Sequence, residues 1–74
     1  MQEFHYQAHS VHADAERTAC VDYWRPVARV SWKEAGGTRH SVLSGQSAWC
    51  TSPDEATFYA MAMARKWINK RLSA

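Results

Sequence analysis

Three of the four histidines lie close together near the amino terminus, and histidine is a common metal ligand. His5, His9 and His12 are spaced by four and three residues, which would gather them on one side of a helix. The segment Phe4 to Val11 alternates between polar and bulky or small residues, which favours a strand instead. On one strand, His5 and His9 would share a face about 13 Å apart, too far to ligate one metal at about 2 Å. We therefore expect these histidines to be surface or pairing residues rather than metal ligands. His40 is expected on a later strand, where it could approach His5 or His9 across the sheet.

The two cysteines, Cys20 and Cys50, lie 30 residues apart and outside any C-x-x-C motif. One disulfide could join them, but a cytosolic chain normally keeps its thiols reduced. No glycine-flanked nucleophile turn accompanies the serines or cysteines, and Gly36-Gly37 matches no phosphate-binding loop. We expect no enzyme, no cofactor and no metal. A site built from His5, His9, His40 and a cysteine is the alternative.

Basic residues recur at every fourth position along the segment Tyr23 to Glu34. Arg25, Arg29 and Lys33 would lie on one face of that strand, and Arg39 follows on the next. A flat basic sheet can contact phosphates or enter a major groove. The alternative is a solvated outer face, because exposed strands often carry Arg and Lys. The net charge of only +2 permits nucleic-acid binding without requiring it.

A long helix is predicted from Pro53 to Leu72. Ser52 is suited to cap it, Pro53 to occupy its first position, and Glu55 to complete a capping box. Its apolar arc is wider than one thin sheet needs. We expect Trp49 to pack beneath the first turn. Phe58 is expected to be exposed. Loops or the amino terminus would cover the excess apolar arc, or it would form a self-association surface around Phe58 and Met61.

The remaining segments predict a small sheet. Trp24, Ala28, Val30 and Trp32 would form the face beneath the helix. The expected fold is α+β: a three-stranded antiparallel sheet with one carboxy-terminal helix on one face, β-β-β-α, in a single domain 1–74. The expected order is a strand at Phe4 to Val11, a loop at His12 to Asp22, a strand at Tyr23 to Glu34, a turn at Ala35 to Thr38, a strand at Arg39 to Ser44, and a turn at Gly45 to Ser47.

Composition places the chain among small folded proteins. Its 74 residues are 46% hydrophobic and allow one thin core, so dimerisation is a reasonable expectation. No apolar run approaches the roughly 20 residues that span a bilayer. The first residues lack the basic segment and apolar core of a signal peptide. We expect a cytoplasmic protein that does not associate with membranes.

The order of three strands, a Gly-Gly hairpin and a final helix resembles two families of DNA-binding domains. These are the plant ethylene-response-type domain and the arm-binding amino-terminal domain of phage and transposon integrases. In both families the sheet reads the major groove. The resemblance therefore implies DNA contacts from one strand, at Trp24, Arg25, Arg29, Trp32 and Lys33.

A second resemblance covers most of the chain. The segments Trp24 to Val30, Ser52 to Ala56 and Ala64 to Asn69 are similar to those of small, uncharacterised bacterial proteins with a strand, a turn, a strand and a helix. This resemblance implies the β-β-β-α fold and a bacterial, cytosolic origin. It assigns no site residues.

The sequence thus predicts a small, non-enzymatic binding or interaction module. A protein partner or a second copy of the chain is the leading expectation, with the surface around Phe58 and Met61 as the self-association site. Nucleic acid against the basic face, formed by Arg25, Arg29, Lys33 and Arg39, is the alternative.

Overall fold

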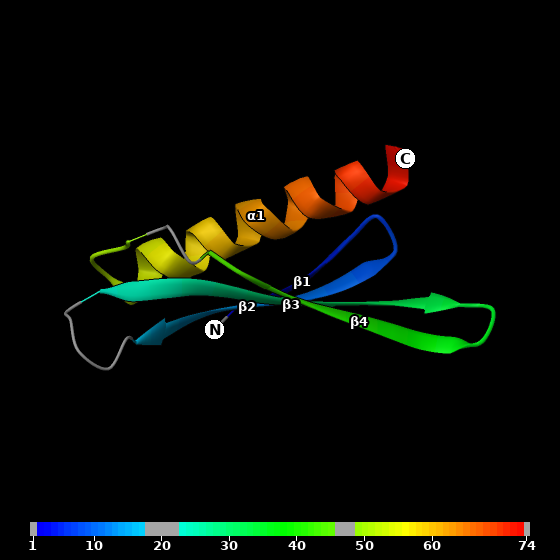
Figure 1. Cartoon of the computed structure of the whole chain (residues 1–74), viewed down its shortest axis with the longest axis horizontal. Coiled ribbons are helices and arrows are strands. Elements are labelled where there is room, and N and C mark those ends of the chain that lie inside the picture. Colours follow the sequence, from blue (N-terminus) through cyan, green and yellow to red (C-terminus); the bar gives the residue numbers. More distant parts are fainter. Residues whose placement is uncertain (1, 18–22, 46–48, 74) are drawn as a thin grey trace.

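The chain folds into two layers, an antiparallel sheet of four strands and one helix that lies across one face of the sheet (Figure 1). The computed structural model describes residues 2–17, 23–45 and 49–73. The strands follow one another in the sheet in their sequence order, β1-β2-β3-β4. The elements are β1 (Gln2–Tyr6), β2 (His9–Arg17), β3 (Trp24–Glu34), β4 (Gly37–Ser44) and α1 (Pro53–Ser73).

The α+β class and the single carboxy-terminal helix are confirmed, but the expected number of strands was wrong. The segment Phe4 to Val11, expected as one strand, contains the turn of a hairpin. Gln7 and Ala8 both adopt positive φ, 50° and 62°, and Tyr6 pairs with His9 across them. Positive φ at both central residues is the geometry of a tight hairpin turn. Glutamine and alanine seldom take it, which hid the turn in the sequence.

The expected loop from His12 to Asp22 is also corrected, because β2 runs through most of it to Arg17. Val11 and Ala13 on β2 are buried, whereas Ser10 and Asp14 are exposed. This alternation is the period of a half-buried strand. The polar side chains that suggested a loop therefore occupy the outer face of a central strand.

The second hairpin and the helix formed as predicted. Glu34 pairs with Gly37 across the turn at residues 35 and 36, and Gly37 adopts a φ of 127° that favours glycine. Ser52 caps α1, because its Oγ accepts the Glu55 N–H at 3.1 Å. The Glu55 carboxylate instead accepts the Thr51 hydroxyl at 3.1 Å, so only half of the expected capping box forms.

The core between the two layers is built largely from small residues. The buried face of α1 is a ladder at every fourth position, Ala56, Ala60, Ala64 and Ile68. It packs on Val11, Ala13, Ala28 and Val30 of the two central strands. Alanines let the helix lie close to the sheet, but they bury little apolar area each. The result is the thin core that the length of the chain predicted.

The segment that leads into the helix differs from the prediction at Trp49. Trp49 does not pack beneath the first turn: it is 60% exposed and lies edge-on to Tyr23, with ring centroids 5.4 Å apart. The adjacent Cys50 is buried instead, because its backbone pairs with Trp24 at the start of β3. Cys20 and the end of the turn expected at Gly45 to Ser47 lie outside the described residues.

A group of side chains, which we call the Glu34 cluster, holds the end of α1 to the second hairpin. The Glu34 carboxylate accepts the Trp32 indole N–H at 3.0 Å and an Arg71 N–H at 2.8 Å. Arg39 Nε lies 3.2 Å from the same carboxylate. The Arg71 guanidinium stacks 4.2 Å above the Trp32 ring. The helix is therefore fixed at both ends, by the Ser52 cap and by this cluster.

Within the described residues, α1 is too polar along its length to cross a membrane.

Candidate functional site

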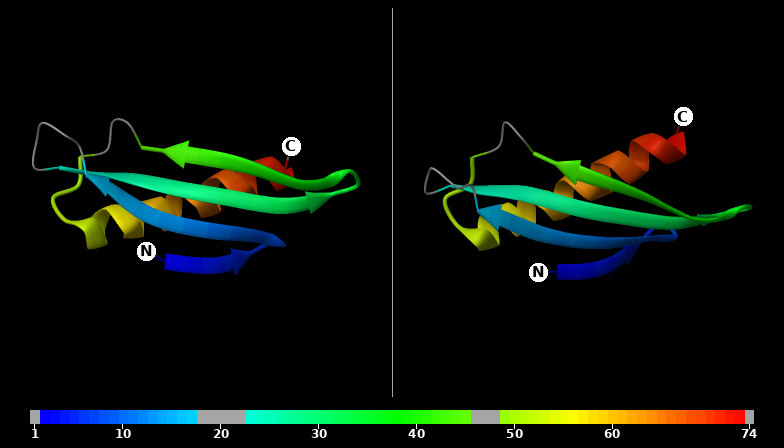
Figure 2. Two further views of the ribbon diagram at one scale, coloured as in Figure 1. Left: turned by 90° about the horizontal axis from the view of Figure 1, so that it is seen from below. Right: turned by 60° about the horizontal axis from the view of Figure 1, so that its bottom comes forward.

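The pairing register divides the polar residues between the two faces of the sheet. Arg25, Arg29 and Lys33 on β3 alternate with the buried residues Pro26, Ala28 and Val30, so they lie on the face that α1 leaves uncovered. We call this the open face; it is turned toward the viewer in Figure 2. Arg39 lies on the other face, because it pairs with Trp32 and reaches Glu34. The expected basic face therefore contains three of its four members.

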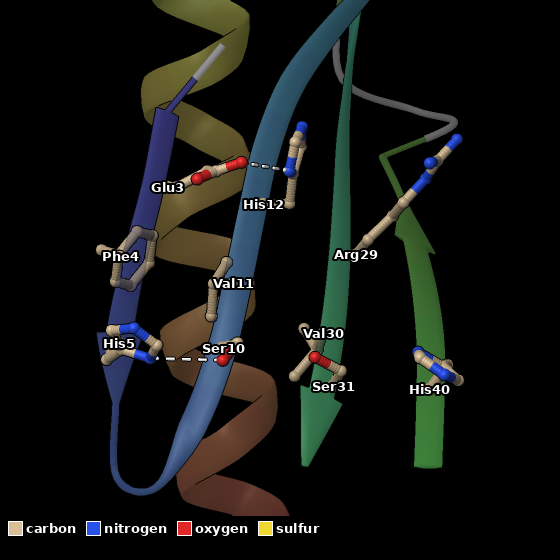
Figure 3. Close-up of a pocket in the computed structure, with 10 residues that line it drawn as sticks. All are labelled: Glu3, Phe4, His5, Ser10, Val11, His12, Arg29, Val30, Ser31 and His40. Atoms are coloured by element: carbon tan, nitrogen blue, oxygen red, sulfur yellow. Dashed lines mark hydrogen bonds and ion pairs between the residues drawn. The ribbon is translucent and has the colours of Figure 1, made fainter. Parts of the chain in front are cut away.

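A hollow lies on the open face. Figure 3 shows it spanning all four strands, and its volume is about 470 Å³. We call it the open groove. Its polar side chains come from every strand: Glu3, His5, Ser10, His12, Arg29, Ser31 and His40.

The open groove continues along the sheet in both directions. Toward the second hairpin, a shallow hollow of about 400 Å³ shares Ser10 and Ser31 with it and adds Lys33 and Thr38. Toward the other end, a smaller hollow of about 190 Å³ is lined by Arg29 together with the acidic residues Asp14 and Glu16. The open face is therefore a long depression, with the carboxylates Asp14 and Glu16 at one end, which we call the acidic end, and Lys33, in a hollow lined by no described acidic residue, at the other, the basic end.

Two of the acidic residues of this face lie beside basic side chains of a neighbouring strand. Glu3 lies 3.0 Å from His12 Nδ1, and Glu16 lies 3.5 Å from Arg25 (Figure 3 shows the first pair). Asp14 accepts the N–H of the residue that follows it, at 2.8 Å. Three acidic and three permanently basic side chains of the described residues share the face. Arg29 and Lys33 are the two of these cations that have no ion pair with a described residue.

The histidines are split between the two faces, contrary to the expectation that His5 and His9 share one. His5 and Ser10 are cross-strand neighbours on the open face and share a hydrogen bond of 3.2 Å. His9 lies on the opposite side and is only 4% exposed. Its Nδ1 donates to the Gln7 carbonyl at 2.6 Å, and its ring lies 5.5 Å from that of Trp32. The turn at Gln7 and Ala8 causes the split, because it places the two histidines on different strands.

The residues of the alternative metal or enzyme site are not brought together. His5 and His40 lie on the open face, His9 lies beneath the sheet, and Cys50 pairs with Trp24 near the start of the helix. Burial, together with the nearby Glu55 charge, raises the pKa of the Cys50 thiol, which disfavours the thiolate. Among the described residues, no three His, Cys, Asp or Glu side chains are placed to hold one metal ion.

The proposed self-association surface on the helix is only partly exposed. Phe58 is 69% exposed, as expected, and Tyr59 beside it is 49% exposed. Met61 is half-buried and packs against the core. Met61 therefore offers less accessible surface than Phe58, and self-association through these two residues stays a prediction.

Sequence reasoning missed most residues that line the open groove outside β3. Glu3, His12 and His40 enter the groove only because β1, β2 and β4 flank β3 in a fixed register. One signal was present: Ser10, His12, Asp14 and Glu16 alternate with Val11, Ala13 and Ala15, which is the pattern of a strand with one polar face. The register of β4 also depends on a two-residue turn, and that turn assigns His40 rather than Arg39 to the open face.

Comparison of the chain with protein-family models, with curated proteins and with solved structures found no match. The resemblances to the two DNA-binding families and to small bacterial proteins therefore stay predictions.

Proposed function

We propose that this chain is a small, non-enzymatic binding module that uses the open face of its sheet to hold an acidic segment of a partner protein. The observation that carries the proposal is the open groove itself. It combines contributions from all four strands with Arg29, which has no ion pair with any described residue and lies where the groove meets the neighbouring hollow. Lys33 continues this basic character along β3, four residues further on.

The charge pairing of the face supports an acidic ligand. Glu3 and Glu16 already have basic neighbours, so they offer little attraction to an incoming cation. The planar guanidinium of Arg29 can donate two parallel hydrogen bonds to one carboxylate, a bidentate pairing. His40 stands on β4 beside Ser31, the next outward residue of β3 after Arg29. A carboxylate that enters the groove would therefore meet donors from two adjacent strands.

Protein is favoured over nucleic acid by the acidic end of the same depression. A nucleic-acid strand carries a negative phosphate at every nucleotide and would have to pass Asp14, whose carboxylate has no ion pair with any described residue. Arg25, the first cation of the basic row, is already engaged by Glu16. A polypeptide can place one or two carboxylates at the basic end and neutral or basic residues at the other.

Binding is favoured over catalysis by the backbone around Ser10 and His5, the one hydrogen-bonded pair of serine and histidine on the described part of this face. Ser10 and His5 are hydrogen-bonded, which is one requirement of a nucleophile and its base. Ser10 lies on a central strand, where its backbone N–H is used in the sheet. Free N–H groups aimed at a developing oxyanion are the second requirement, and the outward N–H of His5, on the edge strand β1, points away from Ser10.

The proposal is tested by following backbone amide resonances while a short polyglutamate peptide is added. We expect shifts concentrated at Arg29, Ser31, Lys33 and His40, and their size should fall at higher salt. Replacing Arg29 and Lys33 by Gln should abolish the shifts. The matched control is Lys66→Gln, which removes an exposed cation from the helix and should leave them unchanged.

A DNA duplex added under the same conditions separates the alternatives. Shifts with the duplex but not with the peptide, with an affinity that falls steeply with salt, would replace the proposal with nucleic-acid binding. The absence of shifts with either probe would contradict a binding role for the basic end of the open face.

A further inference from the structure

The outer strand β4 presents an unprotected edge to solvent. It is the last strand of the described sheet, and no described strand pairs with its outer side. The backbone N–H of Gly45 donates to Pro26 at 3.0 Å, which fixes the alternation of hydrogen bonds along the pair. Arg39, Ser41 and Leu43 therefore bond to β3.

The intervening residues direct their N–H and C=O groups away from the sheet. These residues are Thr38, His40, Val42 and Ser44, and their side chains belong to the open face. Natural sheets commonly protect such an edge with proline, lysine, a bulge or a very short strand. In β4 these four positions carry none of those devices, and Val42 is 65% exposed. The one charged residue of the strand, Arg39, is drawn back to Glu34.

The opposite edge is different. β1 has five residues, and the pairing of Tyr6 with His9 next to the turn leaves only Glu3 and His5 directed outward. Glu3 places a carboxylate in the middle of that edge. The two edges of the sheet are therefore unequal, and only β4 offers a long, uncharged row of free backbone groups.

We infer that β4 pairs with β4 of a second copy of the chain, in antiparallel fashion, about a twofold axis at Ser41. In this register His40 pairs with Val42 of the second copy and Thr38 pairs with Ser44, so every outward group of the four positions finds a partner. An axis at His40 leaves Ser44 unpaired, and an axis at Val42 leaves Thr38 unpaired. Such a twofold contact closes on itself and ends the assembly at two chains.

Two further observations favour a second copy over another partner. The axis falls at a small residue, and the central pair at this register lacks hydrogen bonds, which is where strands approach most closely. The core also consists mainly of alanines, and Ile68, Val30 and Pro26 are its largest fully buried side chains. A chain of 74 residues with so little buried bulk gains stability from continuing its sheet into a second copy.

The test uses the whole chain and a proline at an outward position. Val42→Pro removes an N–H that the monomer does not use, so β3 and β4 stay paired, and far-UV circular dichroism should be unchanged. We expect sedimentation equilibrium to show a dimer for the original chain and a dimer at least about tenfold weaker for this variant, because symmetry removes two hydrogen bonds. Val42→Thr, which keeps both the N–H and a β-branched side chain, should dimerise normally.

Amide hydrogen exchange gives an independent measure if the proline variant fails to fold. The amides of His40 and Val42 should exchange fast in dilute solution and slowly in concentrated solution, whereas the Ser41 amide should be protected in both. The inference is overturned if the original chain sediments as a monomer of 8.4 kDa at millimolar concentration. It is also overturned if a dimer forms without protecting His40 and Val42.

Discussion

In the Glu34 cluster, the ionised carboxylate of one residue contributes to the stability of the fold. The hydrogen bond from the Trp32 indole and then that from Arg71 hold the pKa of the Glu34 carboxyl below its usual value of 4.5, against the opposing effect of burial. The ionised carboxylate is the form that these donors bind. The attachment of the helix end to the second hairpin therefore depends on the charge of Glu34.

This arrangement predicts an acid-sensitive contribution to stability. Because the pKa is lower in the folded chain than in the unfolded one, the contribution is complete above pH 4.5 and disappears as the pH falls through the folded value. Urea unfolding should therefore show Glu34→Gln to be less stable than the original chain at neutral pH, with the difference shrinking in acid. A difference that is the same at both pH values would show that the charge of Glu34 plays no part.

The alanines of α1 set the distance between the helix and the sheet. Ala60 is fully buried against the central strands, whereas Ala62 on the same helix is exposed. Ala60→Leu should destabilise the chain by about 1–3 kcal/mol, because the larger side chain must push the layers apart. Ala62→Leu makes the same chemical change in solvent and should stay within about 0.5 kcal/mol. Equal effects in thermal unfolding would contradict the packing described here.

At the scale of elements, the first hairpin depends on an unfavourable turn. Gln7 and Ala8 both adopt the left-handed region, which favours Asn and Gly. The strands on either side supply the compensating energy: Tyr6 donates its hydroxyl to Asn69 at 2.8 Å, and the Arg65 guanidinium lies 5.8 Å from the Phe4 ring centre. Contacts with the helix thus hold β1 in a hairpin that its turn residues do not favour.

Replacing the turn by Asn-Gly tests this account. Gln7→Asn combined with Ala8→Gly should raise the free energy of unfolding by about 0.5–2 kcal/mol, because both residues accept positive φ. As a control, Ala62→Gly introduces glycine within a helix and should lower that free energy by about 1 kcal/mol. Destabilisation by the Asn-Gly turn, measured by urea unfolding, would mean that β1 and β2 are not joined in this way.

The sequence predicted the elements with strong local signals. The Ser52 cap, the apolar ladder of α1 and the Gly-Gly turn each identify a structure without reference to the rest of the chain. The Gln7-Ala8 turn lacks such a signal, because its geometry is imposed by contacts with a helix some sixty residues later (Tyr6 to Asn69). Because β1 and β2 were predicted as one strand, His9 was placed on the same face as His5, whereas it lies on the opposite face of the sheet.

At the scale of the whole molecule, the pairing register of the four strands decides which side chains reach the candidate site on the open face. Arg25, Arg29 and Lys33 could be grouped from the sequence because they lie on one strand. Their neighbours could not, since a shift of one residue in the pairing moves a side chain to the other face of the sheet. Arg39 illustrates this: the two-residue turn before β4 places it beside Trp32, and places His40 beside Ser31. The mixed charge of the open face appears only once the strands are paired.

The central claim, that unpaired cations on the open face hold an acidic partner segment, is tested most directly by reversing their charge. The variant with both Arg29→Glu and Lys33→Glu keeps the two side chains on the solvent side of β3, so the fold should be unchanged. Isothermal titration calorimetry should show that this variant loses affinity for a polyglutamate peptide and gains affinity for a polylysine peptide of the same length. Unchanged binding of the acidic peptide by the charge-reversed chain would contradict the account.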